Sequence, residues 1–451
     1  MNFDYQRGFV VNPEAPPDSL EAKRPYIDNG VGNWSKNRYF CRDFMQQEAD
    51  KLWSRTWLIA GASSEIPDTG DYLVFEIGSE SIIVVRTTTG IRAHFNVCPH
   101  RGTRLVRSER GNRRRFICPF HSWKFSLDGE LQEITDRETF REEVICQNPG
   151  LTSVACEEKA GLVFVNMDRN ATPLAESIGL PEGYLEAYQI DRMKVVRHVR
   201  SEWAANWKVG VEAFYETYHL HSVHPETRWV MADLKVQIDL YPKGASRMIV
   251  PIGQMTPRIE DQDSLNDGLK MMLAEVGLNP DDFEGKATAV RTAIQQAKRQ
   301  RAESLGMDIS QFCDGQLTDS WATGIFPNVQ IGCHPEGIFL MRFLPHPTDP
   351  ERFYYDTMTL IRPVEHPDDK VPDWMGLPEG TDISGQTRPA CEHVGINEDA
   401  NLGLVLDQDS ELLPTVQAGM RSRGFKAQIW GEQESRLRHF HTELDRYLKT
   451  N

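Results

Sequence analysis

Two stretches of this chain carry cysteine, histidine and carboxylate residues at spacings that suit metal binding. The first reads NVCPHRGTRLVRSERGNRRRFICPFHSWK and presents Cys98 with His100 in one Cys-Pro loop and Cys118 with His121 in a second. The resulting pattern is C-x-H-x17-C-x2-H. Two thiolates and two imidazoles suit either zinc or an iron–sulfur cluster. Zinc fingers more often place a close pair of Cys in one segment and a close pair of His in another, on a helix.

In this chain each loop supplies one Cys and one His, so the two loops form a two-fold arrangement. Such a pair of loops can hold a two-iron cluster with both Cys on one iron and both His on the other. That ligand set is the Rieske pattern, in which His ligation raises the reduction potential above that of all-Cys clusters. A structural zinc site is the alternative.

The second stretch, EAFYETYHLHSVHP, begins at Glu212 and ends at Pro225. Non-heme Fe(II) oxygenases bind iron with two His and one carboxylate, which leaves open positions for O₂. His219 and His224 would point about 140° apart on a regular helix, so they converge only if the helix ends or distorts between them. Pro225 favours such an ending. Equally, any of the histidines in this stretch, His221 included, can be an ordinary hydrogen-bonded residue.

Seven arginines lie between the two Cys-His loops. They form either a solvated surface loop with subunit contacts or a basic collar that steers an acidic electron donor to the cluster. The residues are Arg101, Arg104, Arg107, Arg110, Arg113, Arg114 and Arg115.

The composition limits the class of protein. The 451 residues include 50 Lys and Arg against 66 Asp and Glu, a formal net charge of −16, which argues against a general nucleic-acid binder. No apolar run approaches the length of a membrane span, and the N-terminus lacks the pattern of a signal peptide. Eight cysteines are sparse for a disulfide framework. We therefore expect a cytoplasmic protein that acts on small molecules.

The elements that must position these residues form a mixed α+β protein. Runs such as YLVFEI, SIIVVRT and GLVFVNM predict a small antiparallel β domain, and later runs such as IFLMRFL and FYYDTMTLI predict a second sheet. The β domain is therefore inserted early in a larger α+β domain. The expected divisions are an N-terminal arm and helix over 1–44, a metal-cluster domain over 45–168, and a catalytic domain over 169–451 with a helical insertion at 262–307.

The boxes CPHRG at Cys98 and CPFHSW at Cys118, with the flanks WLIAGASSEIPDTGDY and LDGEL, resemble the Rieske oxygenase α subunits of the aromatic-ring-hydroxylating type. The resemblance implies a Rieske [2Fe-2S] domain, with Cys98, His100, Cys118 and His121 as cluster ligands. It also implies a larger helix-grip catalytic domain with an antiparallel sheet and helices.

The segment from Glu216 to His224 is similar to the D/E-x2-H-x4-H element of that family, which implies mononuclear Fe(II) held by His219 and His224. The family takes its carboxylate ligand from a C-terminal helix, and VLDQDSELLPTVQAGM resembles that segment. The carried-over ligand is Asp409. Asp407 is the alternative ligand. The two side chains would point about 160° apart on a helix, so at most one of them can reach the iron.

The resemblance gives Glu216 another role. An acidic residue at this position in the family bridges the two metal centres across a subunit interface. Glu216 would thus support His219 and contact His121 of a neighbouring chain, with a homotrimer as the expected assembly. A small β subunit is also possible, and no nucleic acid or membrane partner is expected.

By the same resemblance, the chain uses O₂ and takes electrons from a separate reductase, directly or through a ferredoxin, so that NAD(P)H acts only indirectly. Hydroxylation of an aromatic substrate is the leading expectation, in a pocket near Phe214, Tyr215 and Val405. The alternatives are a monooxygenase that removes O- or N-methyl groups or hydroxylates an aliphatic carbon, and a Rieske electron-transfer protein. Many relatives have Asn where this chain has Ala213, so the resemblance does not carry the substrate of a particular relative over to this chain.

Overall fold

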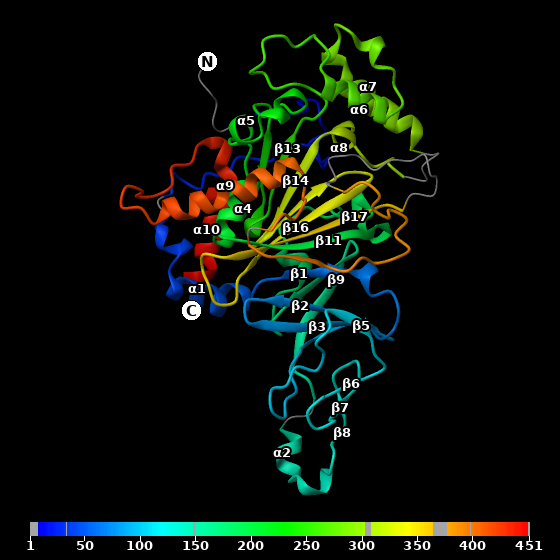
Figure 1. Ribbon diagram of the computed structural model, residues 1–451, viewed down its shortest axis with the longest axis vertical. Coiled ribbons are helices and arrows are strands. Elements are labelled where there is room, and N and C mark those ends of the chain that lie inside the picture. Colours follow the sequence, from blue (N-terminus) through cyan, green and yellow to red (C-terminus); the bar gives the residue numbers. More distant parts are fainter. Residues whose placement is uncertain are drawn as a thin grey trace. The chain divides into compact units, whose positions relative to one another are not determined.

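The computed structural model describes residues 8–32, 34–147, 150–302, 308–363, 377–396 and 398–449 (Figure 1). It divides into two units. The smaller unit comprises Gln46–Ser177 and His346–Thr348, and the larger comprises Met1–Met45, Ile178–Pro345 and Asp349–Asn451. Among the described residues, no helix combines the length and the apolar character that crossing a membrane requires.

The smaller unit is built on a seven-stranded antiparallel sheet in the order β1-β10-β9-β4-β3-β2-β5. β-Branched and aromatic residues dominate its central strands, as such half-buried surfaces favour. The turn between β2 and β3 has two residues, and Gly78 takes its first position at φ 56°, where other residues are strained. The strands are β1 (Leu58–Ala62), β2 (Asp71–Ile77), β3 (Glu80–Thr87), β4 (Gly90–Phe95), β5 (Arg110–Asn112), β9 (Ser153–Lys159) and β10 (Leu162–Asn166).

A second, three-stranded sheet in this unit follows the order β6-β7-β8 and carries the loop that contains Cys118. Its strands are β6 (Phe116–Ile117), β7 (Lys124–Phe125) and β8 (Leu131–Glu133). The short helices α2 (Glu142–Cys146) and α3 (Leu174–Ser177) belong to the same unit, and α1 (Arg42–Glu48) runs across the boundary between the two units.

The larger unit is built on an eight-stranded sheet in the order β12-β13-β14-β15-β16-β17-β11-β18. All neighbours are antiparallel except β18, which pairs in parallel with β11 at the edge. The strands are β11 (Lys194–Trp203), β12 (Gln237–Leu240), β13 (Ser246–Val250), β14 (Ser320–Ile325), β15 (Val329–Cys333), β16 (Gly337–Pro345), β17 (Phe353–Ile361) and β18 (Glu392–Val394).

Three helices of the larger unit, α4 (Trp207–Phe214), α9 (Leu404–Met420) and α10 (Ser435–Lys449), line the cavity beside the second candidate metal site. Helix α4 contacts the strands β15, β16 and β17 on one side and α9 on another, while α10 contacts β12 (Figure 1). Gly210 allows α4 to lie this close to the sheet, because a Cβ there would come within 2.7 Å of the Phe353 ring. The other helices are α5 (Leu220–Val223), α6 (Asp267–Glu275), α7 (Val290–Arg301) and α8 (Asp314–Thr318).

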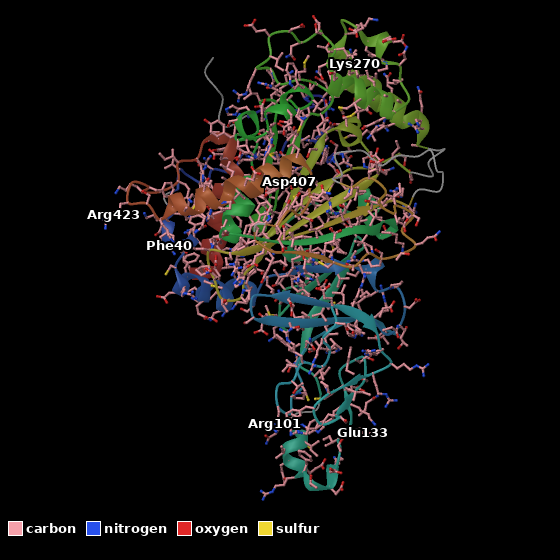
Figure 2. The ribbon with its side chains drawn as sticks, viewed as in Figure 1. Phe40, Arg101, Glu133, Lys270, Asp407 and Arg423 are labelled. Atoms are coloured by element: carbon pink, nitrogen blue, oxygen red, sulfur yellow. The ribbon has the colours of Figure 1, made fainter. Side chains whose placement is uncertain are left out.

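The predicted insertion at 262–307 contains α6 and α7, and its last five residues lie outside the described part of the chain. The two helices enclose a small apolar core of their own, which includes Leu269, Leu273, Val290 and Ile294 (Lys270 of α6 is labelled in Figure 2). The N-terminal arm is held to the larger unit by polar contacts. For example, the backbone N–H of Arg24 donates to Asp239 of β12 at 2.7 Å.

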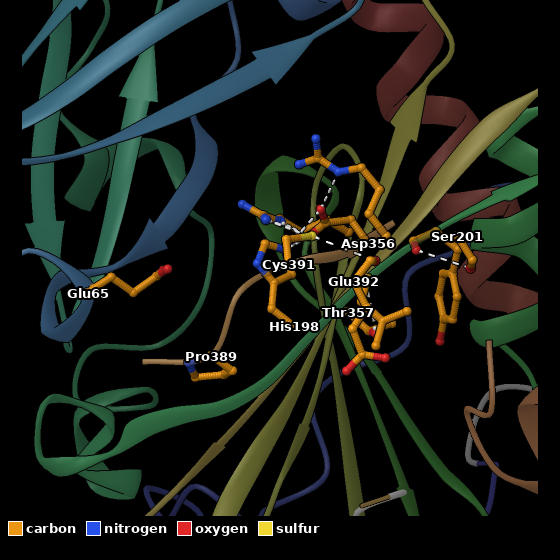
Figure 3. A network of polar contacts seen from close by, with 12 residues as sticks. Glu65, His198, Ser201, Asp356, Thr357, Pro389, Cys391 and Glu392 are labelled. Carbon is orange, nitrogen blue, oxygen red and sulfur yellow. Dashed lines mark hydrogen bonds and ion pairs between the residues drawn. The ribbon is translucent and has the colours of Figure 1, made fainter. Parts of the chain in front are cut away.

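A buried carboxylate ties three neighbouring strands of the larger sheet together (Figure 3). Asp356 of β17 is fully buried and accepts from Arg200 of β11 at 2.7 Å, from Arg342 of β16 at 2.9 Å, and lies 3.2 Å from the ring of His198. Burial alone would raise the pKa of Asp356, but the charges of Arg342 and Arg200 outweigh burial and hold this pKa well below its usual range.

Substituting Asp356→Asn is expected to destabilise the larger unit by about 3–5 kcal/mol at neutral pH, because it leaves buried cations without their counter-charge. A carboxyl group whose folded-state pKa is depressed stabilises the fold above its unfolded pKa of about 3.9, and this stabilisation is lost as the pH falls. The difference between the urea midpoints of the native chain and the variant should therefore begin to shrink below about pH 4 and vanish only below the depressed folded-state pKa of Asp356.

The matched control for this prediction is Glu284→Gln, because Glu284 forms an exposed ion pair with Lys270 at 3.5 Å. Such a pair is worth less than about 1 kcal/mol. Equal urea midpoints for Asp356→Asn and Glu284→Gln at neutral pH would contradict the structural role given to Asp356.

Candidate metal centres

The two Cys-His loops of the smaller unit share one backbone design. In the first, the N–H of Cys98 donates to the carbonyl of Thr103 at 2.8 Å, and Gly102 N–H donates back to Cys98 at 2.9 Å. In the second, Cys118 N–H donates to Trp123 at 2.8 Å, and Ser122 N–H donates back to Cys118 at 3.0 Å.

The fifth residue of each loop has a left-handed backbone conformation, with φ 77° at Gly102 and φ 60° at Ser122. The same conformation therefore closes both turns. The two loops are thus matched, as a shared cluster requires.

All four predicted cluster ligands are brought together. Cys98 and Cys118 are buried in one apolar core, and the rings of His100 and His121 lie with centroids 4.7 Å apart. The Nδ1 atoms of both histidines are buried and make no hydrogen bond with the described residues. A buried ring nitrogen without a hydrogen-bond partner lowers the stability of the fold unless it binds another group. Two such nitrogens beside two thiols are the ligand set of a Rieske cluster. Burial also raises the pKa of the Cys98 thiol to about 11, so a thiolate there needs a cationic partner.

Aromatic side chains surround these histidines, and this role of theirs was not predicted from the sequence. The indole of Trp123 stacks on His100 with centroids 4.8 Å apart, and Phe120 stacks on His121 at 3.9 Å. Phe120 is itself 53% exposed, and the guanidinium of Arg101 lies over its ring at 5.0 Å (Arg101 is labelled in Figure 2). The edge of the cluster site therefore presents an apolar and cationic surface.

The second candidate centre forms where the helix around His219 is interrupted, as the sequence predicts. Helix α4 ends at Phe214, and the one-turn helix α5 has His219 before its first residue and His224 after its last. His224 has the non-helical angles φ −120° and ψ 63°, and Pro225 follows it. The break turns the two imidazoles toward the same point.

Asp409 of α9 completes this second group. Its Oδ1 atom lies 3.2 Å from His224 Nε2 and 3.9 Å from His219 Nε2, and the three ligand atoms lie within 4.8 Å of one another. Asp407 does not join them, and its carboxylate accepts instead from the backbone N–H of Leu402 at 3.3 Å (Asp407 is labelled in Figure 2). His221 is exposed, and its Nδ1 contacts the carbonyl of Tyr218 at 2.8 Å.

The distal nitrogens of both histidines have acceptors. Glu216 Oε1 lies 2.5 Å from His219 Nδ1, and Gln408 Oε1 lies 2.6 Å from His224 Nδ1. An acceptor at Nδ1 places the proton there and leaves the Nε2 lone pair directed at a metal. His224 Nε2 is buried without a hydrogen bond among the described residues, so the donor set fits a two-His, one-carboxylate iron centre. Gln408 was not foreseen from the sequence.

A cavity of about 430 Å³ opens beside this group, with His219, Asp409 and Glu216 in its wall. The remaining lining is largely apolar but includes two more carboxyl groups and two aromatic rings, and the described residues that line the cavity include no Lys or Arg. The other lining residues are Val209, Glu212, Ala213, Leu412, Leu413, Val416, Gly419, Met420, Phe425, Gln428, Trp430, Glu434 and Leu437.

The expectation that Phe214 and Tyr215 line this pocket is wrong for this cavity. Phe214 faces the sheet, where its ring stacks on Tyr355 with centroids 5.2 Å apart, and the hydroxyl of Tyr215 donates to Val329 at 2.9 Å. The cavity-facing residues of this segment follow the spacing i, i+3, i+4, i+7 of one helical face. This spacing in the sequence could have identified the cavity-facing residues, which are Val209, Glu212, Ala213 and Glu216.

Comparison with protein families gives two matches. Residues 190–450 match the family described as ring hydroxylating alpha subunit (catalytic domain), and residues 56–148 match the Rieske [2Fe-2S] domain. The first match alone covers more than half of the chain.

Curated relatives point to oxygenase subunits. The chain is 31% identical over 190 residues to the glycine betaine monooxygenase oxygenase subunit of Pseudomonas aeruginosa, covering 42% of this chain and 44% of the relative. It is 34% identical over 206 residues to the carnitine monooxygenase oxygenase subunit of Escherichia coli, covering 45% of this chain and 54% of the relative. These alignments span about half the length of each relative.

Solved structures share the fold. The quaternary ammonium Rieske monooxygenase CntA in complex with L-carnitine superposes with a TM-score of 0.62 at 20% identity, covering 97% of this chain and 100% of that one. Naphthalene 1,2-dioxygenase with indole bound superposes with a TM-score of 0.65 at 19% identity, covering 94% and 93%.

The predicted α+β class, a Rieske domain joined to a larger helix-and-sheet domain, is confirmed by these matches. The chain therefore belongs to the family of ring-hydroxylating α subunits, whose cofactors are a Rieske [2Fe-2S] cluster and a mononuclear iron that reacts with O₂.

Proposed function

We propose that this chain is the terminal oxygenase component of a Rieske system and that it removes an N-methyl group from a quaternary ammonium substrate. Electrons come from a separate reductase, directly or through a ferredoxin. The observation that carries the oxygenase function is the group formed by His219, His224 and Asp409, whose ligand atoms lie within 4.8 Å beside a substrate-sized cavity. A Rieske electron carrier has no use for this second centre.

The choice of substrate revises the leading expectation of aromatic hydroxylation and takes up the N-demethylation alternative. The relatives named above are monooxygenase subunits for glycine betaine and carnitine. The cavity supports the same choice, because its described lining holds the aromatic rings of Phe425 and Trp430 and no Lys or Arg. Aromatic faces attract a quaternary ammonium group, whereas a neutral hydrocarbon has no charge to interact with them.

The overall reaction balances for this substrate. An N-methyl carbon, O₂, two electrons and two protons give an N-hydroxymethyl ammonium and one water. The hydroxymethyl group then leaves as formaldehyde, which releases the tertiary amine and one proton. His219, His224 and Asp409 would hold a mononuclear iron, which would supply open coordination positions for the activation of O₂. Glu216 and Gln408 hold the two imidazoles in the tautomer that binds metal.

The proposed electron path runs between subunits. Glu216 lines the cavity and holds His219, and we propose that it also contacts His121 of the partner subunit in a homotrimer. Exposed apolar side chains on each unit support this docking, since such patches mark interaction sites. They are Phe120 beside His121, and Leu412 and Val416 at the cavity, the latter two each 38% exposed.

The test of the substrate class compares a trimethylammonium compound with its neutral carbon isostere, in which a tert-butyl group replaces the cation. The native chain should bind the cation at least about tenfold more tightly, as a desolvated cation–π contact of about 2 kcal/mol allows. Trp430→Leu should remove most of that preference, as measured by calorimetry on the anaerobic protein. Equal binding of the two compounds by the native chain would contradict a quaternary ammonium substrate.

A further inference from the structure

Glu212 is a cavity-lining carboxyl group for which the metal sites have no use. It lies on α4 one helical turn before Glu216, and it is 8% exposed. Two groups far away in the sequence reach one of its oxygens. The hydroxyl of Tyr39 donates to Glu212 Oε1 at 2.6 Å, and the ring of His441 places Nε2 2.8 Å from the same atom.

The direction of the His441 contact follows from its other nitrogen. Arg38 lies 2.8 Å from His441 Nδ1 and can only donate, so Nδ1 accepts and the ring proton is on Nε2. Burial, together with the charges of Arg38 and Lys208, holds the pKa of His441 well below its usual range, so the ring is neutral. Glu212 Oε1 therefore accepts two hydrogen bonds, from Tyr39 Oη–H and from His441 Nε2–H.

This arrangement decides which oxygen of Glu212 carries a proton. With Oε1 occupied by two donors, the acidic proton resides on Oε2, which makes no hydrogen bond with the described residues. Glu212 lines the same cavity as His219 and Asp409. Burial raises the pKa of Glu212 to about 8, against the lowering effect of the Tyr39 hydrogen bond and the Lys208 charge, so the acid form predominates at neutral pH.

We propose that Glu212 is the proton donor of the oxygenase reaction, with Tyr39 and His441 as the positioning residues that turn its acidic oxygen into the cavity. This inference rests on the proposed function, since the reaction consumes two protons for each water formed. Glu212 gives up the Oε2 proton and becomes a carboxylate. The Tyr39 hydroxyl and the His441 N–H stabilise that charge, and a solvent proton restores the acid before the next turnover.

Charged and titratable groups surround Glu212; Tyr39, Lys208 and Arg38 lower its pKa, and Glu434 raises it. Cations lower the pKa and carboxylates raise it. The groups are Arg38 and Tyr39 of the arm, Lys208 and Glu216 of the same segment, His219 and Asp409 across the cavity, Glu434 before α10, and His441 of α10.

Infrared titration tests the inference without turnover. The metal-free chain should show the C=O band of a protonated buried carboxyl that disappears with a midpoint near pH 8, and Glu212→Gln should lack this band. Glu434→Gln is the matched control, because it removes a different carboxylate of the same cavity and should leave the band in place. If the band persists in Glu212→Gln, or if no such band exists at pH 7, the inference is wrong.

The pH profile provides the second readout. In the native enzyme the rate of the product-forming step should fall as the pH rises above about 8, since the acid form is then lost. Glu212→Gln should retain both metals and substrate binding, slow this step by about 10²-fold or more, and abolish the alkaline limb of the profile.

Tyr39→Phe should move the alkaline limb to higher pH, because it removes a hydrogen bond that lowers the pKa of Glu212. A purely structural role for Tyr39 would change the rate without moving the limb. An unchanged limb in both Glu212→Gln and Tyr39→Phe would overturn the inference alone, whereas a native chain that releases no formaldehyde would overturn the proposed function itself.

Discussion

Substituting His219→Ala is expected to lower the iron content from about three atoms per chain to about two and to abolish product formation, while the red-brown Rieske spectrum stays unchanged. The reason is geometric. The ligand atoms of His219, His224 and Asp409 form one group within 4.8 Å, supplied by the two ends of α5 and by α9. Removing one of three protein ligands leaves too few to hold the metal.

Asp409→Ala should give the same loss of one iron and of product formation, and His221→Ala should give neither. His221 is a matched control because it lies between the two ligands in sequence but is exposed and contacts a backbone carbonyl at 2.8 Å. Iron is counted by plasma emission spectrometry and the cluster by its absorption spectrum. If His219→Ala retained three irons, the mononuclear centre would not lie where the side chains place it.

The second large effect is expected at Glu216. Glu216→Gln should keep both metals and still accept electrons into the cluster, but electron transfer from the cluster to the iron should slow by about 100-fold. The amide oxygen of Gln can still accept from His219 Nδ1, which Glu216 now contacts at 2.5 Å. The amide nitrogen of Gln, however, would face the N–H of His121 of the partner subunit. Both of these groups are hydrogen-bond donors, so the proposed bridge would be broken.

Stopped-flow oxidation of the reduced cluster in the presence of substrate and O₂ measures this step. Glu434→Gln is the control, since Glu434 is another carboxyl group of the same cavity and accepts from the backbone N–H of Gly431, with no hydrogen bond to His219, His224 or Asp409. The double variant Leu412→Glu, Val416→Glu provides an independent approach, because charges on this exposed apolar face should dissociate the trimer, leave the iron content intact and stop transfer. A monomeric variant that turns over at the native rate would rule out the inter-subunit path.

The local part of the metal chemistry could be predicted from the sequence because each loop carries its own ligands. Cys98 with His100, and Cys118 with His121, lie in turns of six residues whose closing hydrogen bonds join residues of the same turn. The convergence of His219 and His224 was predictable for the same reason. Pro225 favours an end of the helix at His224, and the structure has a helix of one turn that ends there.

The rest depends on contacts between distant segments. Asp409 was assigned only by resemblance, since nothing in the sequence near His224 specifies which acid of α9 approaches it. Gln408 and the pair Tyr39 and His441 were not foreseen, because the N-terminal arm and α10 meet α4 only in the folded unit. The cavity lining was mispredicted at Phe214 because the rotation of α4 against the sheet is set by packing, which places that ring on Tyr355.

The central claim is that this chain couples a Rieske cluster to an iron centre for the oxidative removal of an N-methyl group. A single turnover tests it most directly. The trimeric holoenzyme is reduced, separated from reductant, mixed with O₂ and a trimethylammonium compound whose N-methyl groups are labelled with ¹³C, and quenched. Labelled formaldehyde and the tertiary amine with its remaining two N-methyl groups should form in equal amounts, and both should be absent in His219→Ala. Oxidised cluster without labelled formaldehyde, or hydroxylation of an aromatic compound in a parallel reaction in its place, would contradict it.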